Sequence, residues 1–186
     1  MAQEEITVDV LVVGTGAAGM ATAVTAAWNG LEVLVVEKEP RYGGTTARSG
    51  GWLWIPNTRL ATEQGIQEPP GAAKAYLEHE TTTHFDEKRV DAFLEFGPKA
   101  IDFFTRNTCV QFDMPAVFPD YHAEATGGQP GGRSMVTRPF DGRELGARIG
   151  QLAPPLPELT VFGMMLGSGP EIRHFMRAFK SLTSFV

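Results

Sequence analysis

A glycine motif between a predicted strand and a predicted helix limits this chain to few folds. Residues 7–13 are rich in β-branched side chains, as is typical of a strand buried on both faces of a parallel sheet. Residues 17–29 carry apolar side chains on one helical face, and residues 32–36 form a second apolar run. Between the first strand and the helix lie glycines at the spacing of the dinucleotide-binding fingerprint, namely Gly14, Gly16 and Gly19. The pattern predicts an α/β fold with a Rossmann-type βαβ unit in a parallel sheet.

Each position of the glycine motif has a physical reason. Gly14 permits a tight turn, Gly16 lets the backbone approach a pyrophosphate, and Gly19 lets the helix pack closely on the sheet. The first helical residues, Ala17 and Ala18, direct unpaired N–H groups and the positive end of the helix dipole at the phosphates. We therefore expect a dinucleotide site at this turn.

An acidic residue ends the second predicted strand. Glu37 lies about 20 residues beyond the glycine motif, where its carboxylate can accept hydrogen bonds from ribose hydroxyls. The same charge disfavours a 2′-phosphate, which argues against NADP. We count Glu37 and the adjacent Lys38 among the candidate cofactor-binding residues. A tight turn without a ligand would explain the glycines, but it would not explain the whole order of strand, glycines, helix, strand and acid.

A second glycine-rich segment, residues 41–51, follows; we call it the strap. An NAD enzyme has no evident need for it, whereas a flavin coenzyme extends past the first loop with its second phosphate, ribityl chain and isoalloxazine. The glycines would allow close approach, and the hydroxyls would offer hydrogen bonds. A plain Gly/Ser/Thr surface loop is the alternative interpretation. The strap residues that we expect to bind the coenzyme are Gly43, Gly44, Thr45, Thr46, Ser49, Gly50 and Gly51.

The glycine motif, Glu37 and the strap together resemble the N-terminal part of the FAD-dependent fumarate reductase/succinate dehydrogenase flavoprotein superfamily. The stretch from Trp52 to Asn57 is more similar to the 3-ketosteroid dehydrogenase branch of that superfamily. Members with covalently bound FAD carry a histidine in the strap, whereas Gly44 and Thr45 stand at that place in this chain. The resemblance therefore implies non-covalent FAD.

A further similarity concerns Tyr121. The sequence Phe118-Pro119-Asp120-Tyr121 is similar to a stretch of 3-ketosteroid Δ1-dehydrogenases whose tyrosine lines the substrate cavity and assists proton abstraction. The resemblance implies that Tyr121 is catalytic: hydride passes to flavin N5 while a tyrosine-based system removes a proton beside a ketone. An ordinary turn residue is the alternative interpretation of Tyr121.

We expect an FAD-dependent oxidoreductase that acts on CH–CH bonds of a steroid-like ketone. One alternative is a fumarate-reductase-like activity on a small dicarboxylate, and another is a truncated FAD-binding module without turnover. The resemblance covers nearly the whole chain but only about the first third of a typical member, so we expect this chain alone to lack a complete active site. A dicarboxylate would need free cations, and the loop region contains four arginines that could bind it, namely Arg133, Arg138, Arg143 and Arg148. The alternative is that these arginines are solvated or pair with Glu124, Asp141 and Glu144.

On this interpretation, the chain consists of two consecutive parts. Residues 1–70 would form the N-terminal part of the FAD-binding domain, strap included, within an incomplete domain. Residues 71–186 would form a helical and irregular continuation. Within it, residues 113–141 show no periodicity and are a candidate substrate-cavity loop. A helix beginning near Asp86 should be kinked or split at Pro98, because proline lacks a backbone donor.

Composition excludes several classes of partner. A net charge of −6 argues against nucleic acid. Cys109 is the single cysteine, which excludes an internal disulfide, and we expect it to be a small core residue. Four scattered histidines suggest no metal site. We expect a cytoplasmic protein with no signal peptide and no membrane span, because no apolar run approaches about 20 residues. Missing sheet strands would expose an edge and favour self-association.

Overall fold

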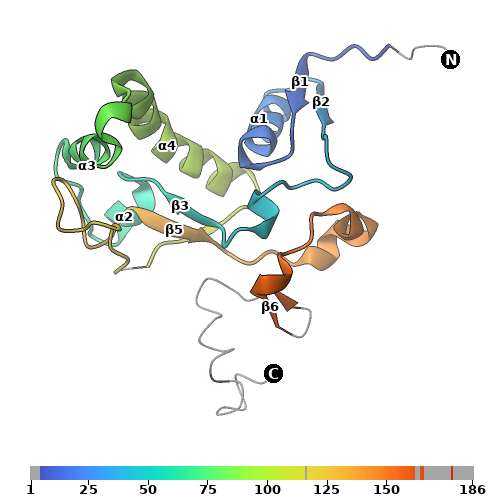
Figure 1. The fold of residues 1–186 in the computed structure, drawn as a ribbon. Helices are drawn as coiled ribbons and strands as arrows, with labels where there is room; N and C mark the ends of the chain where they lie inside the picture. Colours follow the sequence, from blue (N-terminus) through green and yellow to red (C-terminus); the bar gives the residue numbers. More distant parts are fainter. Residues whose placement is uncertain (1–4, 116, 162–163, 166–176, 178–186) are drawn as a thin grey trace. The chain divides into compact units, whose positions relative to one another are not determined.

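The computed structural model describes residues 5–115, 117–161, 164–165 and 177. These residues fall into two units. The first unit comprises residues 1–50 and 141–186, and the second comprises residues 51–140, coloured from cyan to orange in Figure 1. In the part of the chain that the structure describes, no helix is both long and apolar enough to cross a bilayer.

A βαβ unit forms the beginning of the first unit. Strand β1 (Val10–Val13), helix α1 (Ala17–Trp28) and strand β2 (Val33–Val36) follow one another, and the two strands pair in parallel from Val10–Val33 to Val13–Val36. The helix ends at Asn29, and Gly30 adopts a φ of +81° just beyond it, as helix C-termini commonly require. The α/β prediction is confirmed.

Strand β1 is less buried than its sequence predicts. Val12 is buried. A Cβ added to Gly19 of α1 would lie 3.5 Å from the Val12 side chain, so α1 packs over the face of the strand that carries Val12. Leu11 and Val13 alternate with Val12 along the strand, and they are 58% and 79% exposed. The expectation of burial on both faces is therefore wrong for the described residues, because α1 covers the face that carries Val12.

Within the first unit, the strap pairs with a segment from late in the chain. It contains the 3₁₀ turn η1 (Thr46–Arg48), and Tyr42 forms an isolated parallel bridge with Leu152. The Tyr42 N–H donates to the carbonyl of Gln151 at 3.0 Å, and the Ala153 N–H donates to the carbonyl of Tyr42 at 2.8 Å. The remaining elements of this unit are η3 (Gly142–Gln151), η4 (Pro157–Leu159) and the paired strands β6 (Thr160–Val161) and β7 (Met164–Met165).

The second unit contains an antiparallel sheet of order β3-β5-β4. Strand β5 (Ser134–Thr137) is central, between β3 (Trp52–Trp54) and β4 (Phe112–Asp113). Trp52 pairs with Val136 and Trp54 with Ser134. The expectation that residues 113–141 lack regular structure is wrong at β5. Three of its four residues are buried, so the strand has no polar/apolar alternation to reveal it.

Helices complete the second unit: α2 (Arg59–Glu63), α3 (Ala72–Thr81), the 3₁₀ turn η2 (Thr82–His84) and α4 (Glu87–Asn107). The Asp86 side chain caps α4 by accepting from the Arg89 N–H at 3.2 Å. Helix α4 continues through Pro98, so the predicted split at this residue is wrong. Gly97 explains this, because a glycine before proline has no Cβ to crowd the ring.

The core of the second unit lies between the sheet and helices α2 and α4. Its buried side chains are Ala61, Ile101, Phe112, Met114 and Met135. Partly buried apolar side chains surround them, including Leu53 from β3 and Phe104 from α4. The core thereby fixes β3, whose tryptophans are described next.

Candidate functional site

The glycine loop leaves the start of α1 open. Gly14 has a φ of +96°, and a Cβ on Gly19 would collide with the Gly14 carbonyl group. The N-cap residue, Gly16, offers no side-chain hydrogen bond to the first turn of the helix. Ala17 and Ala18 are exposed. The positive end of the helix dipole lies at this loop, but of the two N–H groups predicted to face a ligand, that of Ala17 already donates to the Thr46 hydroxyl at 2.9 Å.

Glu37 and Thr15 connect the glycine loop to the strap. One Glu37 carboxylate oxygen accepts hydrogen bonds from both the backbone N–H (2.9 Å) and the hydroxyl of Thr15. The other accepts from the Glu39 N–H at 3.0 Å, and the Thr15 hydroxyl accepts from the Gly43 N–H at 2.8 Å. The Thr15 hydroxyl, followed by these backbone N–H groups, lowers the pKa of Glu37 to about 2.

Sequence reasoning missed Thr15. It is 8% exposed, and it is the residue through which the acidic residue and the strap are joined. A polar residue between two glycines of a tight turn is the signal that could have revealed it. Lys38, in contrast, points into solvent and pairs with Glu39 at 3.6 Å.

The strap lies against the glycine loop. Gly43 and Gly44 have φ values of +111° and +55°, and a Cβ on Gly44 would lie 3.4 Å from the Gly16 Cα. The Thr46 hydroxyl accepts from the Ala17 N–H at 2.9 Å, so it lies at the N-terminus of α1. The loop and the strap therefore form one surface, on which Gly44, Thr45, Thr46, Ser49 and Gly50 are exposed. Gly51 belongs to the second unit, where its carbonyl accepts from the Thr137 N–H at 3.1 Å.

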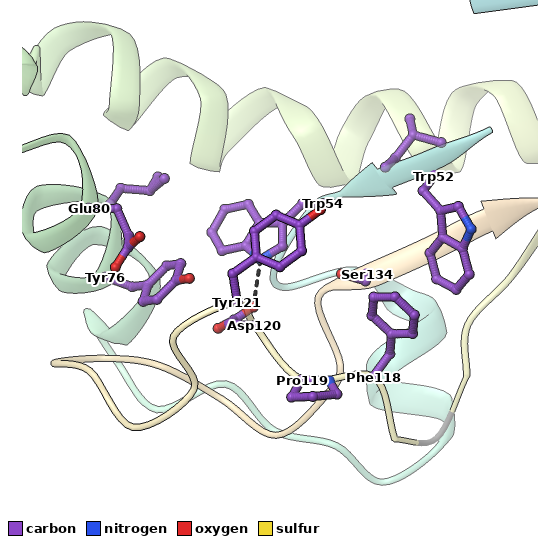
Figure 2. A pocket seen from close by; sticks show the side chains of 11 residues that line it. Trp52, Trp54, Tyr76, Glu80, Phe118, Pro119, Asp120, Tyr121 and Ser134 are labelled. Carbon is purple, nitrogen blue, oxygen red and sulfur yellow. Dashed lines mark hydrogen bonds between the residues drawn. The ribbon is translucent and has the colours of Figure 1, made fainter. Parts of the chain in front are cut away.

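A pocket of about 490 Å³ lies in the second unit (Figure 2). Aromatic side chains dominate its wall, and Trp52 stacks on Phe118 with ring centroids 4.2 Å apart. The Trp54 ring stacks on Tyr76 at 5.9 Å. The residues that line the pocket are Trp52, Leu53, Trp54, Tyr76, Leu77, Glu80, Phe118, Pro119, Asp120, Tyr121 and Ser134.

A buried ion-pair network anchors the loop that carries Tyr121. Arg133 pairs with Asp120 at 2.6 Å and with Glu68, and it also donates to the Gly127 carbonyl at 2.7 Å. The other oxygen of Asp120 accepts from the Trp54 indole N–H at 2.7 Å, the bond that is dashed in Figure 2. Because these side chains are almost fully buried, the network holds Asp120 firmly under the pocket wall.

Tyr121 itself is 96% exposed, yet both of its neighbours are held in place. Asp120 belongs to the network with Arg133. On the other side, the His122 imidazole contacts Glu80 at 2.8 Å, and its backbone N–H donates to the Tyr76 hydroxyl at 3.4 Å. The structure thus presents the Tyr121 phenol at the pocket from an anchored backbone.

Among the residues that the structure describes, three of the four loop arginines have carboxylate partners. Arg133 pairs with Asp120 and Glu68, which the sequence did not predict, while Arg138 pairs with Asp113 at 2.7 Å. The predicted use of Asp141 as a partner is confirmed by its ion pair with Arg143.

Cys109, the single cysteine, is not among the residues that line the pocket. Cys109 is exposed, so its assignment to the core is wrong; it lies just past the end of α4, where the chain leaves the helix for β4. Within the described ranges, no group of three or more His, Cys, Asp or Glu residues could hold a metal ion.

Comparisons with known proteins agree with this geometry. The family described as FAD binding domain matches residues 9–179. A 3-oxosteroid 1-dehydrogenase from Mycobacterium tuberculosis is 45% identical over 78% of this chain and 26% of its own length. A 4-oxocyclohex-2-ene-1-carboxylate 5-dehydrogenase from Sinomonas cyclohexanicum is 42% identical over 97% of this chain and 30% of its own length.

A solved structure is also similar. The 3-ketosteroid Δ1-dehydrogenase from Sterolibacterium denitrificans, in complex with 1,4-androstadiene-3,17-dione, matches with a TM-score of 0.81 and 35% identity. The match covers 96% of this chain and 31% of that one. The chain therefore spans less than a third of the length of these relatives.

Proposed function

Because this chain belongs to the FAD binding domain family, we propose that it carries the coenzyme loop and part of the substrate site of an FAD-dependent oxidoreductase. The proposed reaction removes two hydrogens from neighbouring carbons of a cyclic, steroid-like ketone. The observation that carries this proposal is the aromatic pocket beside Tyr121. Similarity to dehydrogenases of 3-ketosteroids and of an oxocyclohexene ring supports it.

The residues of the first unit fit FAD. Gly19 and Gly44 let α1, the glycine loop and the strap pack closely, because a Cβ at either position would meet backbone, and the start of α1 offers the positive end of the helix dipole to the pyrophosphate. Glu37 would accept hydrogen bonds from the ribose, and Thr46 would contact the coenzyme beside the helix. When bound, FAD supplies a hydride acceptor. The strap has no histidine, which supports non-covalent binding.

We assign the remaining strap residues to the coenzyme as well. Thr45, Ser49 and Gly50 would line its extended part, and Gly51 would keep side chains away from the flavin. Gly43 is buried and would act indirectly, through the hydrogen bond of its N–H to Thr15. The same proposal gives residues 1–70 to coenzyme binding, except for Trp52, Leu53 and Trp54, which line the pocket. It places the substrate-cavity loop within residues 113–141, which includes the pocket residues from Phe118 to Tyr121.

The pocket residues suit a flat, apolar ring system. Aromatic faces at Trp52, Trp54 and Phe118 would pack on such rings, and burial of apolar surface would supply the binding free energy. Tyr121 would take part in removing the proton from the carbon beside the ketone, where the carbonyl group acidifies the C–H bond. Its exposed hydroxyl is free to approach that position.

A dicarboxylate substrate has less support. Such a substrate needs cations to bind its carboxylates, and Arg133, Arg138 and Arg143 are each engaged by an aspartate. The pocket wall contains acidic side chains and no lysine, arginine or histidine among its described lining residues.

Flavin colour tests the proposal. Protein purified and supplied with FAD should retain visible flavin absorbance after gel filtration. Bleaching of this absorbance under anaerobic conditions by a 3-ketosteroid saturated at the bond to be oxidised, and not by succinate, would support a steroid-like ketone as substrate. Failure to retain FAD would refute the flavoprotein proposal. Colour that no ketone bleaches would favour a binding module without turnover, and bleaching by succinate would favour the dicarboxylate alternative.

A further inference from the structure

The pocket wall carries one carboxylate without a strong cation partner. Asp120 and Glu80 are the acidic lining residues. Asp120 is neutralised by the buried guanidinium of Arg133 at 2.6 Å. Glu80 instead contacts only histidine side chains in its described ion pairs, at 2.8 Å from His122 and 3.1 Å from His79. In the part of the chain that the structure describes, no lysine or arginine pairs with Glu80, so the pocket wall carries a carboxylate that no permanent cation neutralises.

Glu80 is held in position as part of the wall. Its side chain is 24% exposed, and each of its oxygens is engaged by a different histidine. These hydrogen bonds, that of His122 above all, lower the pKa of Glu80, so the group stays ionised at neutral pH. Figure 2 shows it beside Tyr76, at the end of the pocket away from Trp52. The carboxylate is therefore a fixed negative charge.

We propose that Glu80 is a specificity-determining residue that excludes ketones bearing a carboxylate from this pocket. The inference rests on the proposed function, because it assigns the pocket to the ketone substrate. The two kinds of relative make the distinction meaningful: one acts on 3-oxosteroids, while the other is named for a ring ketone that carries a carboxylate. A fixed negative charge in an otherwise apolar wall repels the second kind and leaves a neutral ring ketone unaffected.

A matched pair of ligands isolates this charge. The probes are 4-oxocyclohex-2-ene-1-carboxylate and its methyl ester, which share one ring but differ in charge. Binding to the full chain is measured at pH 8 by quenching of tryptophan fluorescence, because Trp52 and Trp54 line the pocket. The acid should bind at least about fivefold more weakly than the ester, the factor that like charges a few ångström apart give even in water.

The variant Glu80→Gln keeps the size of the side chain but removes its charge. It should bring the ratio of the two dissociation constants close to one, and an unchanged far-ultraviolet circular dichroism spectrum checks that the variant folds. Glu78→Gln is the matched control. It removes the same charge from an exposed position on the same helix, outside the pocket, and should leave the ratio at its wild-type value.

Each outcome has a defined meaning. Equal binding of acid and ester by the wild type would overturn the inference alone, as would a ratio that Glu80→Gln leaves unchanged or that Glu78→Gln reduces equally. If the wild type does not bind even the neutral ester, the assignment of the pocket to a ketone fails, and the inference falls with the proposed function.

Discussion

Replacement of Arg133 with methionine would leave two carboxylates inside the second unit without their cation. The Arg133 side chain is 1% exposed, and those of Asp120 and Glu68 are 2% and 10% exposed. Methionine fills similar space but offers no charge and no donor. Because removal of one partner from a buried ion pair leaves an uncompensated charge, we expect a loss of about 3–5 kcal/mol in the free energy of unfolding.

Urea unfolding followed by tryptophan fluorescence measures this loss, since Trp54 itself donates to Asp120. Arg138→Met is the matched control. Its ion pair with Asp113 has side chains that are 58% and 43% exposed, so we expect a loss below about 1 kcal/mol. In an Arg133→Met background, Asp120→Asn should recover part of the lost stability, because it removes one of the two stranded charges. Equal small losses for Arg133→Met and Arg138→Met would refute the assignment of a buried network.

Other consequences can be measured in the same protein. Gly19→Ala should cost about 1–3 kcal/mol in unfolding free energy and weaken FAD retention, because the added Cβ meets the Gly14 carbonyl group; unchanged retention would contradict the packing. The pKa of Glu37 is lowered from 4.5 to about 2, so its stabilisation of the glycine loop is complete above pH 4.5 and is lost as the pH falls towards 2. Acid titration monitored by circular dichroism should show this dependence in the wild type and lack it in Glu37→Gln. Tyr121→Phe should slow flavin reduction by a ketosteroid at least about 100-fold while its melting temperature stays unchanged, because the ring is exposed; a normal rate would remove Tyr121 from the mechanism.

The βαβ unit could be predicted from the sequence because its determinants are local. The spacing of Gly14, Gly16 and Gly19 specifies a turn at the start of α1, and the apolar runs on either side specify parallel strands. The contact of Thr15 with Gly43 could not be predicted, since it depends on how the strap folds back onto the loop.

The pocket, in contrast, could not be predicted from local sequence patterns. Its residues come from β3, α3, β5 and the loop before Tyr121, and no sequence spacing relates them. The partners of Arg133 lie 13 and 65 residues away in sequence, so the choice of Asp120 and Glu68 over nearer acids depends on tertiary packing. A resemblance to other sequences pointed to Tyr121, whereas Glu80 carried no local signal.

The bridge between Tyr42 and Leu152 has a consequence for the order of folding. The strap is completed by residues that are synthesised late: the Tyr42 hydroxyl donates to the carbonyl of Arg148, 106 residues further along the chain. Residues 51–140 are continuous in sequence and can close their contacts first. Because non-local contacts carry the larger loop-closure entropy, Tyr42 in the strap should gain its contacts with residues 148–153 after the inserted unit has folded. On the ribosome, the strap would thus be made early but reach its full set of native contacts late.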